Sequence, residues 1–247
     1  MIKKKNKEQI RMIRKSGLIA KFTLKEILCA ARPGVSRLEL EKAANRLIAA
    51  RGAKPSFLGY RGYKFATCIS INDEVVHGMP SERRIKEGDV VSIDVGVNYN
   101  GYFSDTAATV IVGLASREVE KLVWATQRAL MDAISIVEPG VRVGKIENTT
   151  GEVLRGNKLK PILALSGHGV GFAVHEEPSI KSDGEVGGGE VLQEGMVIAI
   201  EPMATLGTGE VYTDNDGWTI KTVDGKPAAH FEHTIVVTKN GYKMLTA

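Results

Sequence analysis

The sequence has few cysteines and no long apolar run, and each absence excludes a class of protein. Only Cys29 and Cys68 are present among 247 residues, and two thiols cannot build the disulfide framework of a small secreted domain. No apolar run approaches the roughly 18–20 residues that a helix needs to span a bilayer. The first residues also lack the apolar core and small-residue cleavage site of a signal peptide. We therefore expect a cytoplasmic protein without a membrane segment.

Several familiar catalytic patterns are missing as well. The Gly-rich piece 184–189 lacks the GxxxxGK[ST] pattern, so we expect a flexible loop and not a phosphate cradle. Cys68 has no base near it in sequence, so a small apolar wall residue is favoured over a nucleophile. No pair of histidines forms the His-Glu-x-x-His signature. The five histidines are His77, His168, His175, His230 and His233.

The positive charge is concentrated at the N-terminus. The net charge is +4, with 43% hydrophobic and 25% charged residues, which is ordinary for a globular protein with a large core. Residues 1–15 nevertheless carry seven cations against one acid: Lys3, Lys4, Lys5, Lys7, Arg11, Arg14 and Lys15. A solvated helix face is one interpretation, and contact with a polyanion such as ribosomal RNA is the other. No aromatic residue is interleaved, so base stacking is not expected.

Apolar spacing and stop signals predict four helices and a set of strands. Ser36-Arg37-Leu38-Glu39 has the form of a capping box that opens a helix. Asn98-Tyr99-Asn100-Gly101 is typical of a hairpin turn. The expected helices are 10–31, 37–51, 118–137 and 143–155, and the best strand candidates are 67–71, 90–97, 106–112, 197–201, 219–223 and 232–238.

Two stretches, EGDVVSIDVG at 87–96 and EGMVIAIEPM at 194–203, share one pattern. Each begins Glu-Gly, continues through an apolar run and then places a lone acid, Asp94 or Glu201, where a buried core should continue. The two stretches are offset by 107 residues, and Pro-Gly-Val at 33–35 recurs at 139–141, offset by 106. This spacing predicts a duplication with a pseudo-twofold, in which two α+β halves share one sheet and their acids meet at its middle.

The predicted strands bring several carboxylates together. Asp94 and Asp105 fall on the same face of the hairpin in either of two turn registers, because side chains alternate with period two. Two such charges about 4 Å apart repel by about 4 kcal/mol at an effective dielectric near 20. Glu201 and Glu232 stand in equally apolar surroundings, and basic residues are scarce near all four acids. Either a lysine or arginine from elsewhere in the chain pairs with each acid, or cations lie among them. Two divalent ions about 3.5–4 Å apart would neutralise all four carboxylates.

Histidine is the expected companion of carboxylates at such a site. His168 lies between glycines in SGHGVG, and His175 follows in VHEEP. The glycines predict a tight loop in which the backbone approaches another group closely.

In their order along the chain, these residues resemble the methionine aminopeptidases. The stretches that carry the resemblance are GYRGYKFATCISINDEVVHGMP, HGVG, EPM, DGWTIKT and EHTIVV. The resemblance implies the pita-bread α+β fold, with pseudo-twofold halves around a central antiparallel sheet, and one catalytic domain over residues 1–247. Only about 25 residues separate His175 from Glu201, which leaves no space for the helical insertion of the type 2 enzymes. Together with the absence of a zinc-binding extension before the catalytic part, this resembles a bacterial-style type 1 enzyme.

The resemblance also implies a metal centre of two divalent ions. Asp94 would bind one ion, Asp105 and Glu232 would bridge the pair, and His168 and Glu201 would complete the second ion. Such oxygen-rich ligands with one imidazole suit Mn²⁺, Fe²⁺ or Co²⁺, and Zn²⁺ less distinctively. The segment 69–74, with Asn72 at its centre, resembles a loop that holds a monovalent cation, Na⁺ or K⁺, through its carbonyls.

Roles in substrate binding and catalysis follow from the same resemblance. Glu201 would shuttle a proton, His175 would stabilise the oxyanion, and His77 would contact the amide of the scissile bond. The side chains expected to build the methionine pocket are Tyr60, Tyr63, Cys68 and Trp218, with His77 and His175 also contacting the substrate. Many relatives carry Phe where this chain has Val174, so we expect a reshaped pocket there, or Phe172 filling part of the space.

The implied function is removal of the N-terminal methionine from nascent polypeptides when the second residue is small. A monomer is expected, with possible ribosome contact through the basic N-terminus. One rival is a proline-directed aminopeptidase or prolidase, which shares the fold and the ligands but usually has a substantial extra N-terminal domain. The other is a non-catalytic binding module on the same fold, although such relatives typically lose ligands that are all present here.

Overall fold

The computed structural model describes residues 2–247 and has an α+β architecture. Its four α-helices are α1 (Lys7–Ala30), α2 (Arg37–Ala49), α3 (Arg117–Ser135) and α4 (Val143–Gly156). Each lies within a few residues of its prediction. The capping box is confirmed, because the Ser36 side chain accepts from the Glu39 backbone N–H while the Glu39 carboxylate accepts from that of Ser36.

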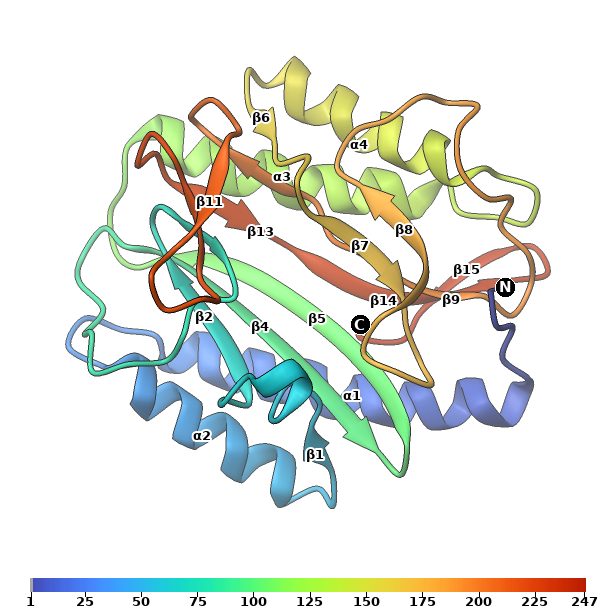
Figure 1. The fold of residues 1–247 in the computed structure, drawn as a ribbon, viewed down its shortest axis with the longest axis horizontal. Coiled ribbons are helices and arrows are strands. Elements are labelled where there is room, and N and C mark those ends of the chain that lie inside the picture. Colours follow the sequence, from blue (N-terminus) through green and yellow to red (C-terminus); the bar gives the residue numbers. More distant parts are fainter. Residues whose placement is uncertain (1) are drawn as a thin grey trace.

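A curved nine-stranded antiparallel sheet forms the centre of the molecule (Figure 1). Its spatial order is β1 (Lys54–Pro55), β4 (Val90–Tyr99), β5 (Tyr102–Ile111), β14 (Glu232–Thr238), β9 (Val197–Ile200), β7 (Ser166–Gly169) and β8 (Glu176–Lys181), with β2 (Thr67–Ile71) beside β4 and β15 (Gly241–Met244) beside β14. One small sheet contains β13 (Ala228–His230), β10 (Met203–Thr205) and β6 (Lys160–Pro161), and another contains β11 (Val211–Thr213), β12 (Ile220–Thr222) and β3 (Glu74–Val76). A short 3-10 helix, η1, covers Tyr60–Gly62.

The β4–β5 hairpin fixes the register of the first two acids. Tyr99 pairs with Tyr102, so the turn consists of Asn100 and Gly101, both in the left-handed region with φ of 54° and 84°. Asp94 then lies opposite Ala107, and Asp105 lies opposite Gly96. The two carboxylates therefore share one face of the sheet, as the alternation predicts. Both strands are longer than predicted because the two-residue turn lets pairing continue to its edge.

The duplication is visible in the hydrogen bonds. The Gly34 N–H donates to Ile85 O in the first half, and the Gly140 N–H donates to Leu192 O at the matching place in the second. Isolated bridges join residues 36 and 84 and, correspondingly, residues 142 and 191. The short strands β1 and β6 are matched in the same way. The halves meet where β5 pairs with β14, so the acid-bearing strands of both halves are brought to the middle of one sheet.

The helices cover one face of the sheet and leave the other for the site. The odd-numbered residues 91–97 of β4 pack against α1 and α2, whereas Ile198 and Ile200 of β9 pack in the cluster of α3 and α4. Figure 1 shows the helices as two pairs behind the strands. Period-two alternation then directs Asp94, Asp105 and Glu232 away from both helical cores. None of the helices between residues 2 and 247 is long and apolar enough to cross a membrane.

The basic N-terminal run is exposed or half-exposed, with one exception that corrects the solvated-face interpretation. Lys5 is only 4% exposed and forms an ion pair with Glu176, whereas Lys3, Lys4, Lys7, Arg11 and Lys15 are exposed.

Candidate metal centre and substrate pocket

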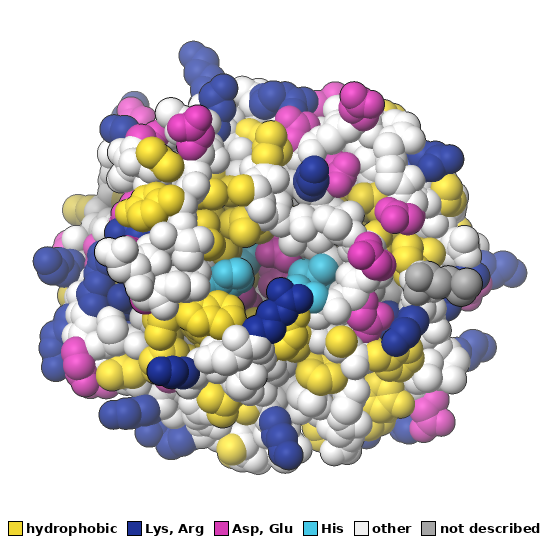
Figure 2. Space-filling model, in the orientation of Figure 1, with side chains coloured by type: hydrophobic (Ala, Val, Ile, Leu, Met, Phe, Trp, Pro, Cys, Tyr) yellow, Lys and Arg dark blue, Asp and Glu magenta, His cyan; other side chains and the backbone are white. Residues whose placement is uncertain are grey.

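A cavity of about 420 Å³ opens on the face of the sheet that the helices leave free. All eleven predicted site residues line it: Tyr60, Tyr63, Cys68, His77, Asp94, Asp105, His168, His175, Glu201, Trp218 and Glu232. Figure 2 shows a hollow with histidine on both sides and acidic side chains at its floor. The cavity therefore unites residues that are up to 172 positions apart in the chain.

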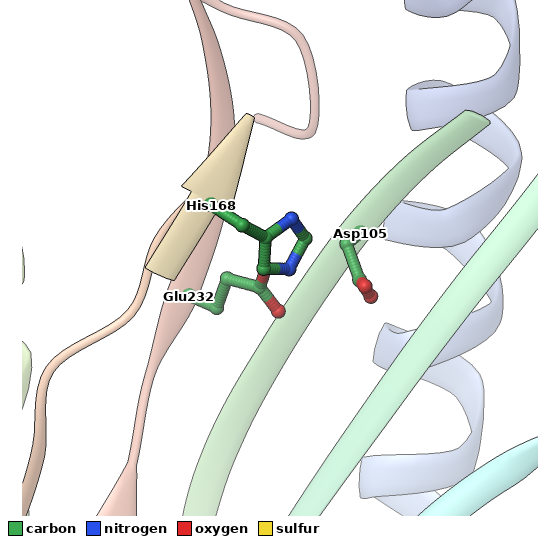
Figure 3. Close-up of side chains that lie close together, drawn as sticks. All are labelled: Asp105, His168 and Glu232. Atoms are coloured by element: carbon green, nitrogen blue, oxygen red, sulfur yellow. The ribbon is translucent and has the colours of Figure 1, made fainter. Parts of the chain in front are cut away.

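Three potential ligand groups converge at the floor of the cavity. Ligand atoms of Asp105 on β5, His168 on β7 and Glu232 at the start of β14 all lie within 4.8 Å of one another (Figure 3). Glu201, which directly follows β9, places Oε1 3.4 Å from Nε2 of His168. Asp94 stands beside Asp105 on the neighbouring strand. In the part of the chain that the structure describes, no lysine or arginine forms an ion pair with any of these four acids.

The electrostatics of the cluster show that the acids repel one another. Burial, followed by its acidic neighbours, raises the pKa of Asp105 and of Glu232 well above the usual range, and burial raises the pKa of Asp94 to about 6. Burial would also raise the pKa of Glu201, but hydrogen bonding to His230 and the proximity of His168 lower it. Without added cations the cluster would retain protons at a pH where isolated carboxyl groups are ionised.

The unpaired polar atoms of the cluster fit divalent metal ions. Asp94 Oδ1 and Glu232 Oε1 are buried and have no hydrogen-bond partner among the described residues. An unsatisfied buried group of this kind costs about 1–3 kcal/mol, and a metal ion would remove that cost for a carboxylate oxygen. His168 Nδ1 lies 2.9 Å from Gly169 O, which orients the ring so that Nε2 faces the carboxylates. Carboxylates with one imidazole are a donor set for Mn²⁺, Fe²⁺, Co²⁺ or Zn²⁺.

Gly167 and Gly169, on either side of His168, allow neighbouring backbones to approach closely, but they lie in a strand and not in a loop. His168 lies in strand β7, between β8 and β9, so the prediction of a tight loop is wrong. A Cβ atom at Gly167 would collide with Ala199 O, and one at Gly169 would collide with Glu177 O. The glycines therefore let two neighbouring backbones pass close enough to hold the His168 strand within the sheet.

An apolar pocket lies beside the acids. Phe57, Tyr63, Cys68 and Val174 are buried together there, with Trp218 packed against them. The Tyr63 ring is edge-on to Trp218 at 5.0 Å, and its hydroxyl donates to Thr67 O. Burial raises the pKa of the Cys68 thiol, which keeps it neutral and agrees with the role of a wall residue.

Phe172 does not fill the pocket as one of our alternatives expected. Its ring lies 6.3 Å from that of Tyr102 and 5.2 Å from Lys5 Nζ, away from the cavity lining. Phe57 contributes aromatic surface next to Val174 instead.

His77 and His175 face the cavity as neutral imidazoles. His175 Nδ1 lies 2.9 Å from the Tyr60 hydroxyl, and its ring centroid lies 4.3 Å from that of His168. Burial and then the nearby His168 lower the pKa of His175 to about 4. Burial also lowers the pKa of His77, whose backbone adopts a left-handed φ of 57°. At neutral pH each ring carries one N–H that can donate to a substrate.

The sequence profile described as "Metallopeptidase family M24" matches residues 11–239. The chain belongs to metallopeptidase family M24. Within M24 it is 48% identical to the "Methionine aminopeptidase" of Aquifex aeolicus, with 98% of this chain and 97% of the relative covered. It is 40% identical to "Methionine aminopeptidase 1" of Bacillus subtilis, over 100% and 99% of the two chains. It therefore belongs to the methionine aminopeptidase branch.

Solved structures of a methionine aminopeptidase and of a prolidase both resemble this chain, to different degrees. The crystal structure of the methionine aminopeptidase from Thermotoga maritima superimposes with a TM-score of 0.98 at 41% identity, covering 100% of this chain and 99% of that one. The prolidase from Pyrococcus furiosus gives a TM-score of 0.80 at 28% identity, and only 65% of its chain is covered. The pita-bread architecture is confirmed by both, and the agreement with the methionine aminopeptidase is closer.

The M24 site contains one residue that sequence reasoning left without a role. His230, at the end of β13, is 2% exposed, lines the cavity and places Nε2 3.2 Å from Glu201 Oε2. A period-two spacing before Glu232 was the available signal, since residues two apart on an extended chain share a side. His233 has the opposite orientation, with Nδ1 2.9 Å from Thr246 Oγ1.

Proposed function

We propose that this M24 chain removes the N-terminal methionine from polypeptides whose second residue is small, by metal-assisted hydrolysis of the first peptide bond. The observation that carries the proposal is the position of the acid and imidazole cluster beside an apolar pocket within one cavity. The methionine aminopeptidases that match this chain nearly end to end support the same activity.

For the metal centre, we propose five protein ligands and two divalent ions. Asp94 would hold one ion, His168 and Glu201 the other, and Asp105 and Glu232 would bridge them. When bound, the ions would supply Lewis acidity and a water that is acidic enough to act as a nucleophile near neutral pH. The convergence of Asp105, His168 and Glu232 supports the bridging arrangement. The ions would be Co²⁺, Mn²⁺, Fe²⁺ or Zn²⁺, since the donor set suits each of them.

Three residues would handle protons and charge during hydrolysis. Glu201 has its carboxylate between His168 and His230, and it would accept a proton from the attacking water and return it to the leaving amine. His175 would donate its N–H to the oxygen that becomes negative in the transition state. The Tyr60 hydroxyl at Nδ1 supports this by fixing the His175 ring. His77 would contact the amide of the scissile bond.

The methionine side chain would occupy the apolar pocket formed by Tyr60, Tyr63, Cys68 and Trp218, to which we add Phe57. A thioether packs favourably against aromatic rings and a neutral thiol. The cavity of about 420 Å³ is consistent with one long side chain and a small second residue.

We further propose that residues 1–247 act as one catalytic domain, as a monomer in the cytoplasm on nascent chains. The large sheet shared by both halves supports a single unit. A Na⁺ or K⁺ site at the carbonyls around Asn72 and a ribosome contact through the exposed N-terminal lysines stay predictions.

The test is an assay of the purified chain with Met-Ala-Ser, Met-Arg and Xaa-Pro peptides, after chelation and after addition of each candidate metal. We expect metal-dependent cleavage of Met-Ala-Ser and much slower cleavage of Met-Arg. Preferential cleavage of Xaa-Pro peptides would favour the proline-directed function. Equal rates on Met-Ala-Ser and Met-Arg would contradict the size limit on the second residue.

A further inference from the structure

The N-terminal segment before α1 contains a buried lysine, Lys5, whose ion-pair partner Glu176 lines the cavity. The Lys5 side chain is 1% exposed, and its Nζ lies 2.8 Å from Glu176 Oε2. The Lys5 backbone N–H donates to Gly195 O at 2.7 Å, which fastens the segment to the second half of the molecule. A Cβ atom at Gly171 would meet Lys5 Cε at 2.9 Å, so the lysine stem is tightly enclosed. This degree of enclosure is not that of a solvated surface lysine.

Glu176, the partner of Lys5, holds a loop closed through its other oxygen. Glu176 Oε1 accepts hydrogen bonds from the backbone N–H groups of Phe172 at 2.5 Å and of Ala173 at 3.1 Å. Glu176 also pairs with Gly169, the neighbour of His168, across the β7–β8 ladder. The Glu176 carboxylate therefore fixes the conformation of the loop between His168 and His175.

The loop held in this way carries two parts of the site. Val174 is buried in the apolar pocket, and His175 reaches the Tyr60 hydroxyl. Both are within two residues of Glu176, so a shift of its carboxylate would be passed directly to them. A buried carboxylate that loses its cation either takes up a proton or turns toward water, and in either case the two backbone N–H groups lose their charged acceptor.

We propose that Lys5 is a positioning residue for the active site: by neutralising Glu176 it keeps the 170–176 loop closed and the His175 imidazole in place. This inference rests on the proposed function for the role of His175. It makes the N-terminal segment part of the catalytic apparatus, although Lys5 itself does not touch the substrate.

The experiment compares Lys5→Met with Lys4→Met, which removes an exposed lysine from the adjacent position. We expect Lys5→Met to lower kcat on Met-Ala-Ser about tenfold with KM changed less than about twofold, because His175 acts mainly in the transition state. Hydrogen exchange of the Phe172 and Ala173 amides should accelerate in Lys5→Met and stay unchanged in Lys4→Met. The double variant Lys5→Met with Glu176→Gln should recover several-fold in kcat over Lys5→Met, since no charge is then left unpaired.

Three results would overturn the proposal: a wild-type kcat in Lys5→Met, accelerated exchange over the whole chain instead of the loop, or no recovery in the double variant. Failure of the proposed function and failure of the Lys5 proposal can be told apart. If the wild-type chain does not cleave Met-Ala-Ser, the proposed function is wrong, whereas the exchange rates of Phe172 and Ala173 still report whether Lys5 holds the loop.

Discussion

At the scale of single residues, the cavity is built from groups that would destabilise an ordinary core. Asp105 and Glu232 are 4% and 1% exposed, and neither has a basic partner among residues 2–247. Substituting such a residue by its amide removes charge repulsion while keeping the shape of the side chain. Loss of function and loss of stability should therefore separate at these positions.

Asp94→Asn and His168→Ala should nearly abolish turnover without unfolding the chain. The loss should exceed the roughly 10–100-fold that outer contacts of a metal site typically cost, because each variant removes a proposed ligand itself. Steady-state kinetics with saturating metal would measure the loss, and circular dichroism would confirm the fold. Near-normal cleavage by either variant would contradict the ligand assignment.

His233 lies on the face of the sheet opposite the cavity, and its buried imidazole should make the stability of the chain depend on pH. Burial lowers the pKa of this imidazole to about 4, so between about pH 4 and 6.5 the unfolded chain binds a proton that the folded chain does not. The contribution of His233 to the free energy of unfolding should therefore rise with pH across that window, by about 3 kcal/mol, and be complete above it.

Urea unfolding of the metal-free wild type and of His233→Gln at pH 4.5 and 7 tests this. The difference between the two proteins should change with pH, whereas Thr246→Val, which removes the hydrogen bond but keeps the imidazole, should lower stability equally at both values. A constant difference for His233→Gln would show that the imidazole is not buried as described.

At the scale of elements, local sequence signals located the four helices and the six predicted strands, but they did not indicate every strand. The capping box at Ser36 and the stop at Pro33-Gly34 act within a few residues, so α1 and α2 could be located from sequence. Strands such as β7 and β8 could not, because Ser-Gly-His-Gly has little strand propensity. His168 lies in a strand only because β8 and β9 supply its backbone partners, Ser179 and Ala199, and no local propensity encodes that pairing.

The duplicated helix starts give a matched test of capping. Ser36 caps α2 with a side-chain hydrogen bond, whereas Arg142, at the matching start of α4, makes none to its helix. Ser36→Ala should lower the free energy of unfolding by about 1 kcal/mol and Arg142→Ala by less than about half of that. Chemical denaturation measures both, and equal losses would show that the cap contributes nothing beyond helix propensity.

At the scale of the whole molecule, the proposed metal centre joins the two halves. Asp94 and Asp105 come from the first half, and His168, Glu201 and Glu232 come from the second. A ligand that contacts both halves stabilises the folded state by mass action. Loss of metal should thus weaken the molecule as a whole and not only its site.

Chelation should therefore abolish cleavage and lower the melting temperature, and added Mn²⁺ or Co²⁺ should restore both. In the metal-free chain the pKa of Asp94 is raised to about 6. Between about pH 4 and 6 the folded state then holds a proton that the unfolded state has released, and this contribution to stability is lost as the pH rises.

Because metal competes with that proton, the melting-temperature increase on metal addition should be larger at pH 7.5 than at pH 5.5. Scanning calorimetry with and without chelator measures the increase. If the increase in melting temperature does not depend on pH, metal binding does not displace a proton from Asp94, and this prediction is wrong.

The sequence by itself determined which carboxylates form the site and that their charge must be neutralised. Four acids in apolar runs, with few bases near them, require a cation wherever they meet, and period-two alternation is a local rule that put Asp94 and Asp105 on one face. His230 and Lys5 show the limit of such reasoning. Each contacts a partner, Glu201 or Glu176, that is distant in the sequence. Contacts of this kind depend on how β13 and the N-terminal segment pack against the finished sheet, and no local propensity encodes that packing.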